Sequence, residues 1–100
     1  MPKWVCDPKI ILALRTSKLR WRVLDYLVRI HPKGSYPSEI ARNTGLRANE
    51  VYGVLNGVTN RYKKENSLVN LNLVKRERKN NMWIYYATDL GCKTCRSLIR

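Results

Sequence analysis

One short segment of the chain carries side chains that can hydrogen-bond to the edges of nucleobases. Arg47 and Asn49 belong to the two residue types that make bidentate bonds to bases, arginine to guanine and asparagine to adenine. At helical spacing the polar residues fall on one side, and this candidate base-contact face comprises Arg47, Asn49, Glu50, Tyr52, Gly53 and Asn56. The pattern indicates a surface that distinguishes bases in a major groove. An ordinary helical hairpin, which shows similar periodicity, is the alternative.

Positive charge is in large excess over the whole chain. Lysine and arginine total 20 against 7 acidic residues, so the formal charge is +13, which attracts polyanions. Nucleic acid is therefore the first partner to expect, and an anionic membrane surface is the second. Basic side chains also bind backbone phosphates and supply affinity rather than sequence choice. The candidates for this role lie in a loop and in a predicted hairpin, and they are Arg61, Lys63, Lys64, Lys75, Arg76, Arg78 and Lys79.

Cysteine is the other residue type with chemistry of its own. Cys92 and Cys95 stand three apart near the start of a predicted helix, where the helix dipole and Lys93 or Arg96 would lower a thiol pKa. With Cys6 they form a candidate redox switch or thiolate metal site. One such pair is only half of a four-thiolate zinc site, however, and buried cysteines are common small apolar residues. We therefore interpret the three cysteines as structural and expect no metal and no cofactor.

Catalytic motifs are lacking in the sequence. Its one histidine, His31, directly precedes a proline at a predicted helix end, and the sequence contains no glycine-rich phosphate loop and no nucleophile elbow. The acidic residues are dispersed, and several fall at predicted helix starts, where capping accounts for them. The pattern predicts a protein that is not an enzyme.

The elements that must position the base-contact face are two short helices at residues about 36–58. Pro37 suits the first position of a helix that runs to about Thr44, and Gly45 supplies the left-handed conformation that ends it. The second helix should begin near Arg47 or Ala48. Its apolar residues recur at helical spacing and would face the core, and these are Val51, Val54, Leu55 and Val58. This spacing is typical of a helix-turn-helix.

Three further helices are expected outside this unit. One starts at Asp7 and Pro8, and a second, Lys18–Ile30, carries an apolar stripe that makes it the main core helix. The last covers about residues 90–98 and follows Asp89, which can cap it. The segment from Ser67 to Leu73 has no decisive pattern, so a helix and a crossing over the surface both stay open.

A β-hairpin, or wing, is predicted at residues about 73–88. Two strands, Val74–Arg78 and Met82–Thr88, flank Asn80 and Asn81, which tolerate the positive φ of a tight turn. The turn fixes the register, which pairs Val74 with Ala87, Lys75 with Tyr86, Arg76 with Tyr85, Glu77 with Ile84, Arg78 with Trp83 and Lys79 with Met82. Two arginine–aromatic pairs would then stiffen a projecting hairpin. An edge hairpin whose basic residues only deter aggregation is the alternative.

The order of these elements, and several pieces of the sequence, resemble a known family. Over nearly its whole length the chain resembles archaeal members of the ArsR/MarR-like transcriptional regulators, which are winged helix-turn-helix proteins. The matching pieces are SKLRWRVLDYL, EIARNTGLRANEVYGVL, SLVNLNLVKR and WIYYATDLG. The resemblance implies one winged helix-turn-helix domain over residues 1–100, mainly α with a small β-hairpin (α+β).

Two departures from the family pattern matter. The glycine that commonly precedes the hairpin is Asn72 here, a residue that tolerates a left-handed conformation better than most. Metal-sensing relatives carry a cysteine pair in the helix-turn-helix, or clustered histidines and carboxylates at the dimer helices. Between Tyr36 and Val58 there is neither a cysteine nor a histidine. The family's metal-sensing site is therefore not carried over.

Together these patterns predict a sequence-specific double-stranded DNA-binding protein that regulates transcription. The resemblance implies a homodimer whose seam is formed by the first and last helices; packing of both helices within one monomer is the alternative. No apolar run approaches the ~20 residues of a membrane span and the N-terminus lacks a signal peptide's apolar core, so we expect a cytoplasmic protein without membrane contact. Two other functions stay open, a non-specific architectural (nucleoid-type) DNA-binding protein and a winged helix module that binds RNA or another protein.

Overall fold

The computed structural model describes residues 8–15, 17–57 and 67–98, and these residues form a mainly helical α+β arrangement. In chain order the elements are α1 (Pro8–Arg15), α2 (Lys18–Ile30), α3 (Pro37–Thr44), α4 (Ala48–Asn56), β1 (Val74–Lys79), β2 (Met82–Ala87) and α5 (Asp89–Leu98). The α+β class with one small hairpin is confirmed. None of the helices in the described ranges combines the length and the apolar character needed to cross a membrane.

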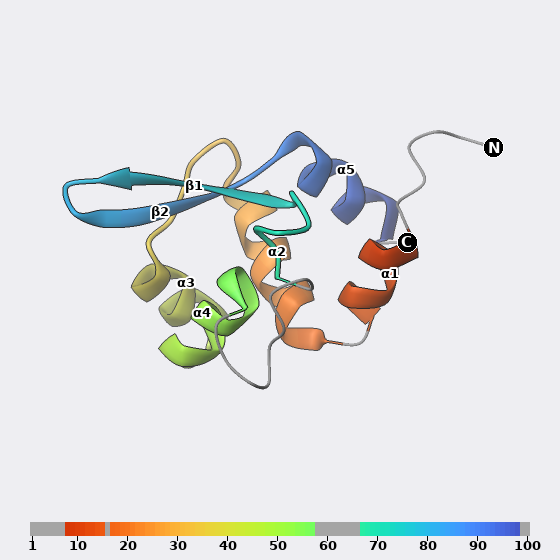
Figure 1. Ribbon diagram of the computed structural model, residues 1–100, viewed down its shortest axis with the longest axis horizontal. Helices are drawn as coiled ribbons and strands as arrows, with labels where there is room; N and C mark the ends of the chain where they lie inside the picture. Colours follow the sequence, from red (N-terminus) through yellow and green to blue (C-terminus); the bar gives the residue numbers. More distant parts are fainter. Residues whose placement is uncertain (1–7, 16, 58–66, 99–100) are drawn as a thin grey trace.

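Helix α2 is the centre of the molecule. It contacts α1, α3, α4, α5 and β2, and its side chains Val23, Leu24 and Leu27 are fully buried. Ser17 begins the helix, because its hydroxyl accepts a hydrogen bond from the Arg20 amide at 3.2 Å. In Figure 1, α3 and α4 lie together on one side of α2, whereas α1 and α5 lie on the other.

The α3–turn–α4 unit forms as the local residues predict. Pro37 occupies the start of α3, and Gly45 ends it with φ 75°, the left-handed conformation that glycine adopts without strain. A carboxylate caps each helix, since Glu39 accepts a hydrogen bond from the Tyr36 amide at 3.1 Å and Glu50 accepts one from the Arg47 amide at 3.0 Å. Each of these hydrogen bonds joins residues three positions apart, so local interactions define where both helices start.

The segment before the hairpin, which the sequence left open, is a series of turns packed under α4. The Leu68 amide donates to the Val54 carbonyl at 3.0 Å and the Val69 amide donates to the Leu55 carbonyl at 3.1 Å. Leu68 is fully buried. Asn72 takes the predicted left-handed conformation, with φ 62°, and so replaces glycine at this corner. Two backbone carbonyls in the last turn of α4 therefore accept hydrogen bonds from amides of the segment that leads into β1.

Strands β1 and β2 form an antiparallel hairpin in the predicted register, from Val74 opposite Ala87 to Lys79 opposite Met82. Asn80 and Asn81 make the turn with φ 50° and 64°, as expected for a tight hairpin. Both strands begin at the predicted residue, and the last residue of each differs from the prediction by one, because β1 ends at Lys79 and β2 at Ala87. The hairpin extends beyond the helices (Figure 1). Its base is held by Ser35, which exchanges two 2.9 Å backbone hydrogen bonds with Tyr85.

Candidate nucleic-acid interface

The first turn of α4 is open to solvent on the side predicted to contact bases. Arg47 and Asn49 are exposed, and Tyr52, one turn further on, keeps 42 % of its surface exposed. The predicted core side of the helix is confirmed where the structure describes it, because Val51, Val54 and Leu55 are fully buried. An arginine, an asparagine and a tyrosine therefore line an accessible helix surface. Val58, the last residue predicted for the core side, lies outside the described residues.

Two residues of the predicted base-contact face, Gly53 and Glu50, are less exposed than predicted. Gly53 is buried, so the prediction that it faces outward is wrong. Glycine has no side chain whose polarity could indicate a direction, so its residue type alone could not place it on either side of the helix. Glu50 is half-buried, and its carboxylate holds the Arg47 amide. That bond stabilises the start of α4 and orients the backbone at Arg47.

Asn56, at the end of α4, joins the helix to the hairpin. Its Nδ2 donates to Tyr85 Oη at 2.9 Å, and its Oδ1 accepts a 3.0 Å hydrogen bond from Arg76 Nη1 and lies 3.3 Å from the same Tyr85 hydroxyl. A guanidinium has donors only, which requires the amide oxygen to be the atom that faces Arg76. The partners are 29 and 20 residues away in the chain, so no local pattern could have predicted these contacts.

The β1 strand carries an almost continuous row of exposed charge. Of the predicted phosphate contacts, Lys75, Arg76, Arg78 and Lys79 are all exposed on this strand. The Arg76 guanidinium lies 4.6 Å from the centroid of the Trp83 ring, and that of Arg78 lies 5.6 Å from it. Trp83 thus contacts both arginines, whereas the sequence predicted one aromatic partner for each. Cation–π contacts of this kind restrain flexible side chains at a projecting tip.

The basic loop that was expected to accompany the hairpin lies outside the described residues. Arg61, Lys63 and Lys64 fall in the range 58–66, so their part in the interface stays a prediction. The described part of the candidate interface is therefore the start of α4 together with β1.

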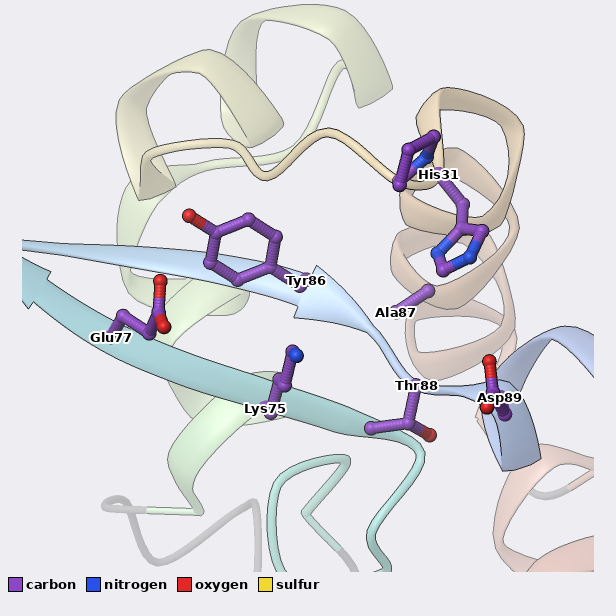
Figure 2. Close-up of a pocket in the computed structure, with 8 residues that line it drawn as sticks. His31, Lys75, Glu77, Tyr86, Ala87, Thr88 and Asp89 are labelled. Atoms are coloured by element: carbon purple, nitrogen blue, oxygen red, sulfur yellow. The ribbon is translucent and has the colours of Figure 1, made fainter.

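The other face of the hairpin is hollowed and carries acidic groups. An open hollow of about 410 Å³ lies between the hairpin, the end of α2 near His31 and the start of α5 (Figure 2). Lys75, Glu77, Tyr86 and Asp89 line it. Burial and a side-chain hydrogen bond to Glu77 raise the pKa of Tyr86 above its ordinary value. Two of the chain's 7 acidic residues, Glu77 and Asp89, line this hollow, so this face suits a polyanion less well than the face with the arginines.

The cysteines of α5 lie in the core. Cys92 is 5 % exposed and Cys95 is 1 % exposed, and Cys6 lies outside the described residues. Burial and the Asp25 carboxylate raise the pKa of Cys95 to about 11, and burial also raises the pKa of Cys92. The prediction that the helix dipole and neighbouring cations would lower these pKa values is therefore wrong. In the described ranges no group of three or more His, Cys, Asp or Glu residues is arranged to hold a metal ion.

These features define a small α+β protein in which a helix with an accessible start is joined at its end to a basic hairpin. Residues 10–98 match the model of the EarA-like family, and the chain belongs to that family. It is similar to an uncharacterized protein of Methanocaldococcus jannaschii, with 40 % identity over 87 residues. The matched region covers 87 % of this chain and 78 % of that protein.

Proposed function

We propose that this protein is a sequence-specific double-stranded DNA-binding protein with a winged helix-turn-helix fold, and that it regulates transcription in the manner of the ArsR/MarR-like regulators. One observation supports the proposal: α4, whose first turn is exposed, is joined at its last residue, Asn56, to Arg76 in the row of basic residues on β1. A helix that contacts bases and a hairpin that contacts phosphates need such a fixed relationship, because both must meet one duplex at once.

The dimensions of α4 support contact with a major groove. Its 9 residues span about 14 Å at 1.5 Å per residue, and a B-form major groove is about 12 Å wide. Arg47 and Asn49, at the accessible end, are the residues we assign to base edges. Tyr52 lies one turn further along and is assigned to the sugar–phosphate backbone or to a thymine methyl group.

The hairpin and the net charge support contact with the DNA backbone. Arg76 and Arg78 share Trp83, so their guanidinium groups are held near one another on an exposed strand. The formal charge of +13 attracts DNA of any sequence and adds affinity at low salt. Specificity is assigned to α4 and general affinity to the hairpin.

We further propose that the protein acts as a homodimer through α1 and α5. Both helices lie on the side of α2 away from α3 and α4 (Figure 1). Each helix presents one exposed large apolar side chain, since Leu12 of α1 is 63 % exposed and Leu90 of α5 is 40 % exposed. A dimer on this side would leave both copies of α4 free for two half-sites of one operator.

The high charge also favours an architectural DNA-binding protein that has no preferred operator. One experiment separates the two functions: fluorescence anisotropy with a duplex from the promoter of the protein's own gene, beside a scrambled duplex of equal length, each at 50 and about 200 mM salt. Preference for the promoter duplex at the higher salt supports a regulator. Equal affinities that fall together support the architectural function, and tighter binding to single strands or A-form RNA would contradict both.

A further inference from the structure

We propose that Asn56 and Tyr85 position the Arg76 guanidinium for its phosphate contact, so that α4 and the hairpin engage DNA as one rigid unit. This inference rests on the proposed function. It also changes the role of Asn56, which the sequence assigned to base contact: Asn56 is a positioning residue, and it acts through Arg76.

Tyr85 provides the fixed end of this chain of contacts. Its side chain is fully buried, and its backbone is held in place by the two hydrogen bonds to Ser35. From this position its hydroxyl accepts the 2.9 Å hydrogen bond from Asn56 Nδ2. A phenol anchored in the core therefore fixes the rotamer of a half-buried amide at the end of α4.

Arg76 is the exposed end of the same chain of contacts. Its Nη1 donates to Asn56 Oδ1 at 3.0 Å while its guanidinium lies 4.6 Å from the centre of the Trp83 ring. These two contacts restrain a side chain that would otherwise sample many rotamers. An arginine has five donor N–H groups, so several remain for a phosphate after one is used on Asn56.

Arg78 offers a matched comparison on the same strand. It is exposed, lies on the same strand face two residues further on, and contacts the same Trp83 ring at 5.6 Å. Among the described residues it has no hydrogen bond to Asn56. A contact made by Arg78 should therefore be insensitive to changes at Tyr85, whereas one made by Arg76 should depend on them.

The energetic consequence of losing the restraint is modest and measurable. An arginine without these two contacts loses rotamer freedom when it binds a phosphate. This entropy cost makes the affinity for DNA about two- to tenfold weaker than with a side chain that is already restrained. Tyr85→Phe removes the hydroxyl and keeps the buried ring. Because residue 85 is fully buried, this substitution removes no atom that can touch DNA.

The test is a pair of double-mutant cycles on one duplex at fixed salt. Affinity is measured for the wild type, Tyr85→Phe, Arg76→Ala and Arg78→Ala, and for Tyr85→Phe combined with each arginine variant. We expect Tyr85→Phe to weaken binding about two- to tenfold in the wild-type and Arg78→Ala backgrounds, and to have no further effect in the Arg76→Ala background.

The outcomes separate this inference from the proposed function. If the wild type does not bind duplex DNA, the proposed function fails, and the inference fails with it. If the wild type binds and Arg76→Ala weakens binding, but Tyr85→Phe has no effect or an equal effect in every background, only the positioning role is overturned. Thermal unfolding of each variant confirms that the compared proteins are folded.

A second measurement needs no DNA and covers the case in which Tyr85→Phe fails to fold. The protein is labelled with 5-fluorotryptophan, and the Trp83 resonance is assigned with Trp83→Phe. Asn56→Ala should shift this resonance, because Arg76 is released from its place over the ring. The same substitution in an Arg76→Ala background should leave the resonance where Arg76→Ala alone puts it. An equal shift in both backgrounds would contradict the positioning of Arg76 by Asn56.

Discussion

The carbonyl oxygen of Leu73 packs directly against the α-carbon of Gly91, in the space that a β-carbon at Gly91 would need. This contact joins the chain just before β1 to the first turn of α5. The same corner is closed by hydrogen bonds, since the Thr88 amide donates to the Leu73 carbonyl at 3.1 Å and the Gly91 amide donates to Thr88 Oγ1 at 2.9 Å. The two ends of the hairpin are therefore held together by backbone groups and by the Thr88 hydroxyl, with no room for a side chain at residue 91.

Gly91→Ala should destabilise the protein by about 1–3 kcal/mol, because the added methyl group overlaps a backbone oxygen that cannot rotate away. Chemical denaturation monitored by circular dichroism measures the change. Arg96→Ala, an exposed substitution in the same helix, serves as the control and should change stability by less than about 0.5 kcal/mol. Equal stability of the two variants would show that α5 moves freely against the start of β1.

Substitution of Arg47 or Asn49 by alanine should change the sequence preference of the protein. Loss of a bidentate base contact reduces discrimination at one base pair by about 1–3 kcal/mol and affects non-specific binding much less. Selection from a randomised duplex library, followed by affinity measurements on single-base variants, provides the data. Lys18→Ala, which removes one exposed positive charge from α2, is the matched control and should leave the preferred sequence unchanged.

Arg78→Ala should instead weaken binding to every duplex alike. If one protein molecule neutralises about six phosphates, the log–log dependence of affinity on salt has a slope near −5, and affinity falls roughly a thousandfold between 50 and 200 mM salt. Removal of one phosphate contact lowers the magnitude of that slope by about 0.9. An unchanged slope for Arg78→Ala would mean that this side chain does not meet the backbone.

A charged residue at position 12 should keep the protein monomeric. Leu12 is 63 % exposed on α1, and in the proposed dimer Leu12→Asp would bury an unpaired carboxylate. Light scattering during gel filtration should give twice 11.8 kDa for the wild type and 11.8 kDa for the variant. A wild type of 11.8 kDa would exclude the dimer and leave α1 and α5 with a role inside one chain.

Local residue chemistry predicted the elements and the hairpin register. Gly45 and the pair Asn80 and Asn81 have the left-handed conformations that their residue types favour, and the position of the two turn residues then fixed the strand pairs. Such features depend on neighbours a few residues away, which a sequence displays directly.

The features that sequence did not predict depend on packing between distant elements. The contacts of Asn56 with Arg76 and Tyr85 arise only once the hairpin lies against the end of α4. The helix dipole favours a lower pKa for Cys95, whereas burial raises it. Burial has the larger effect, because α5 packs against α2 and places the thiol near Asp25.

Stability should depend on pH through Cys95 in the alkaline range. Its pKa in the folded protein is about 11, above the ordinary 9.0, so the folded state favours the neutral thiol. The resulting contribution is complete below pH 9 and is lost as the pH rises toward 11. The difference in unfolding free energy between wild type and Cys95→Ala should therefore shrink between pH 8 and about pH 10.5. A constant difference would show that the thiol does not titrate in this range.

The backbone bridge between Ser35 and Tyr85 divides the hairpin into two halves with different freedom to change during evolution. Toward the base, Val74, Tyr85 and Ala87 are buried, so a substitution there disturbs the core. Toward the tip, the residues from Arg78 to Met82 are exposed, and changes of sequence or length there leave the core intact. In the proposed DNA-binding role, a lineage could therefore change its general affinity for DNA by altering the tip of the hairpin alone, while the rest of the protein remained under selection for folding.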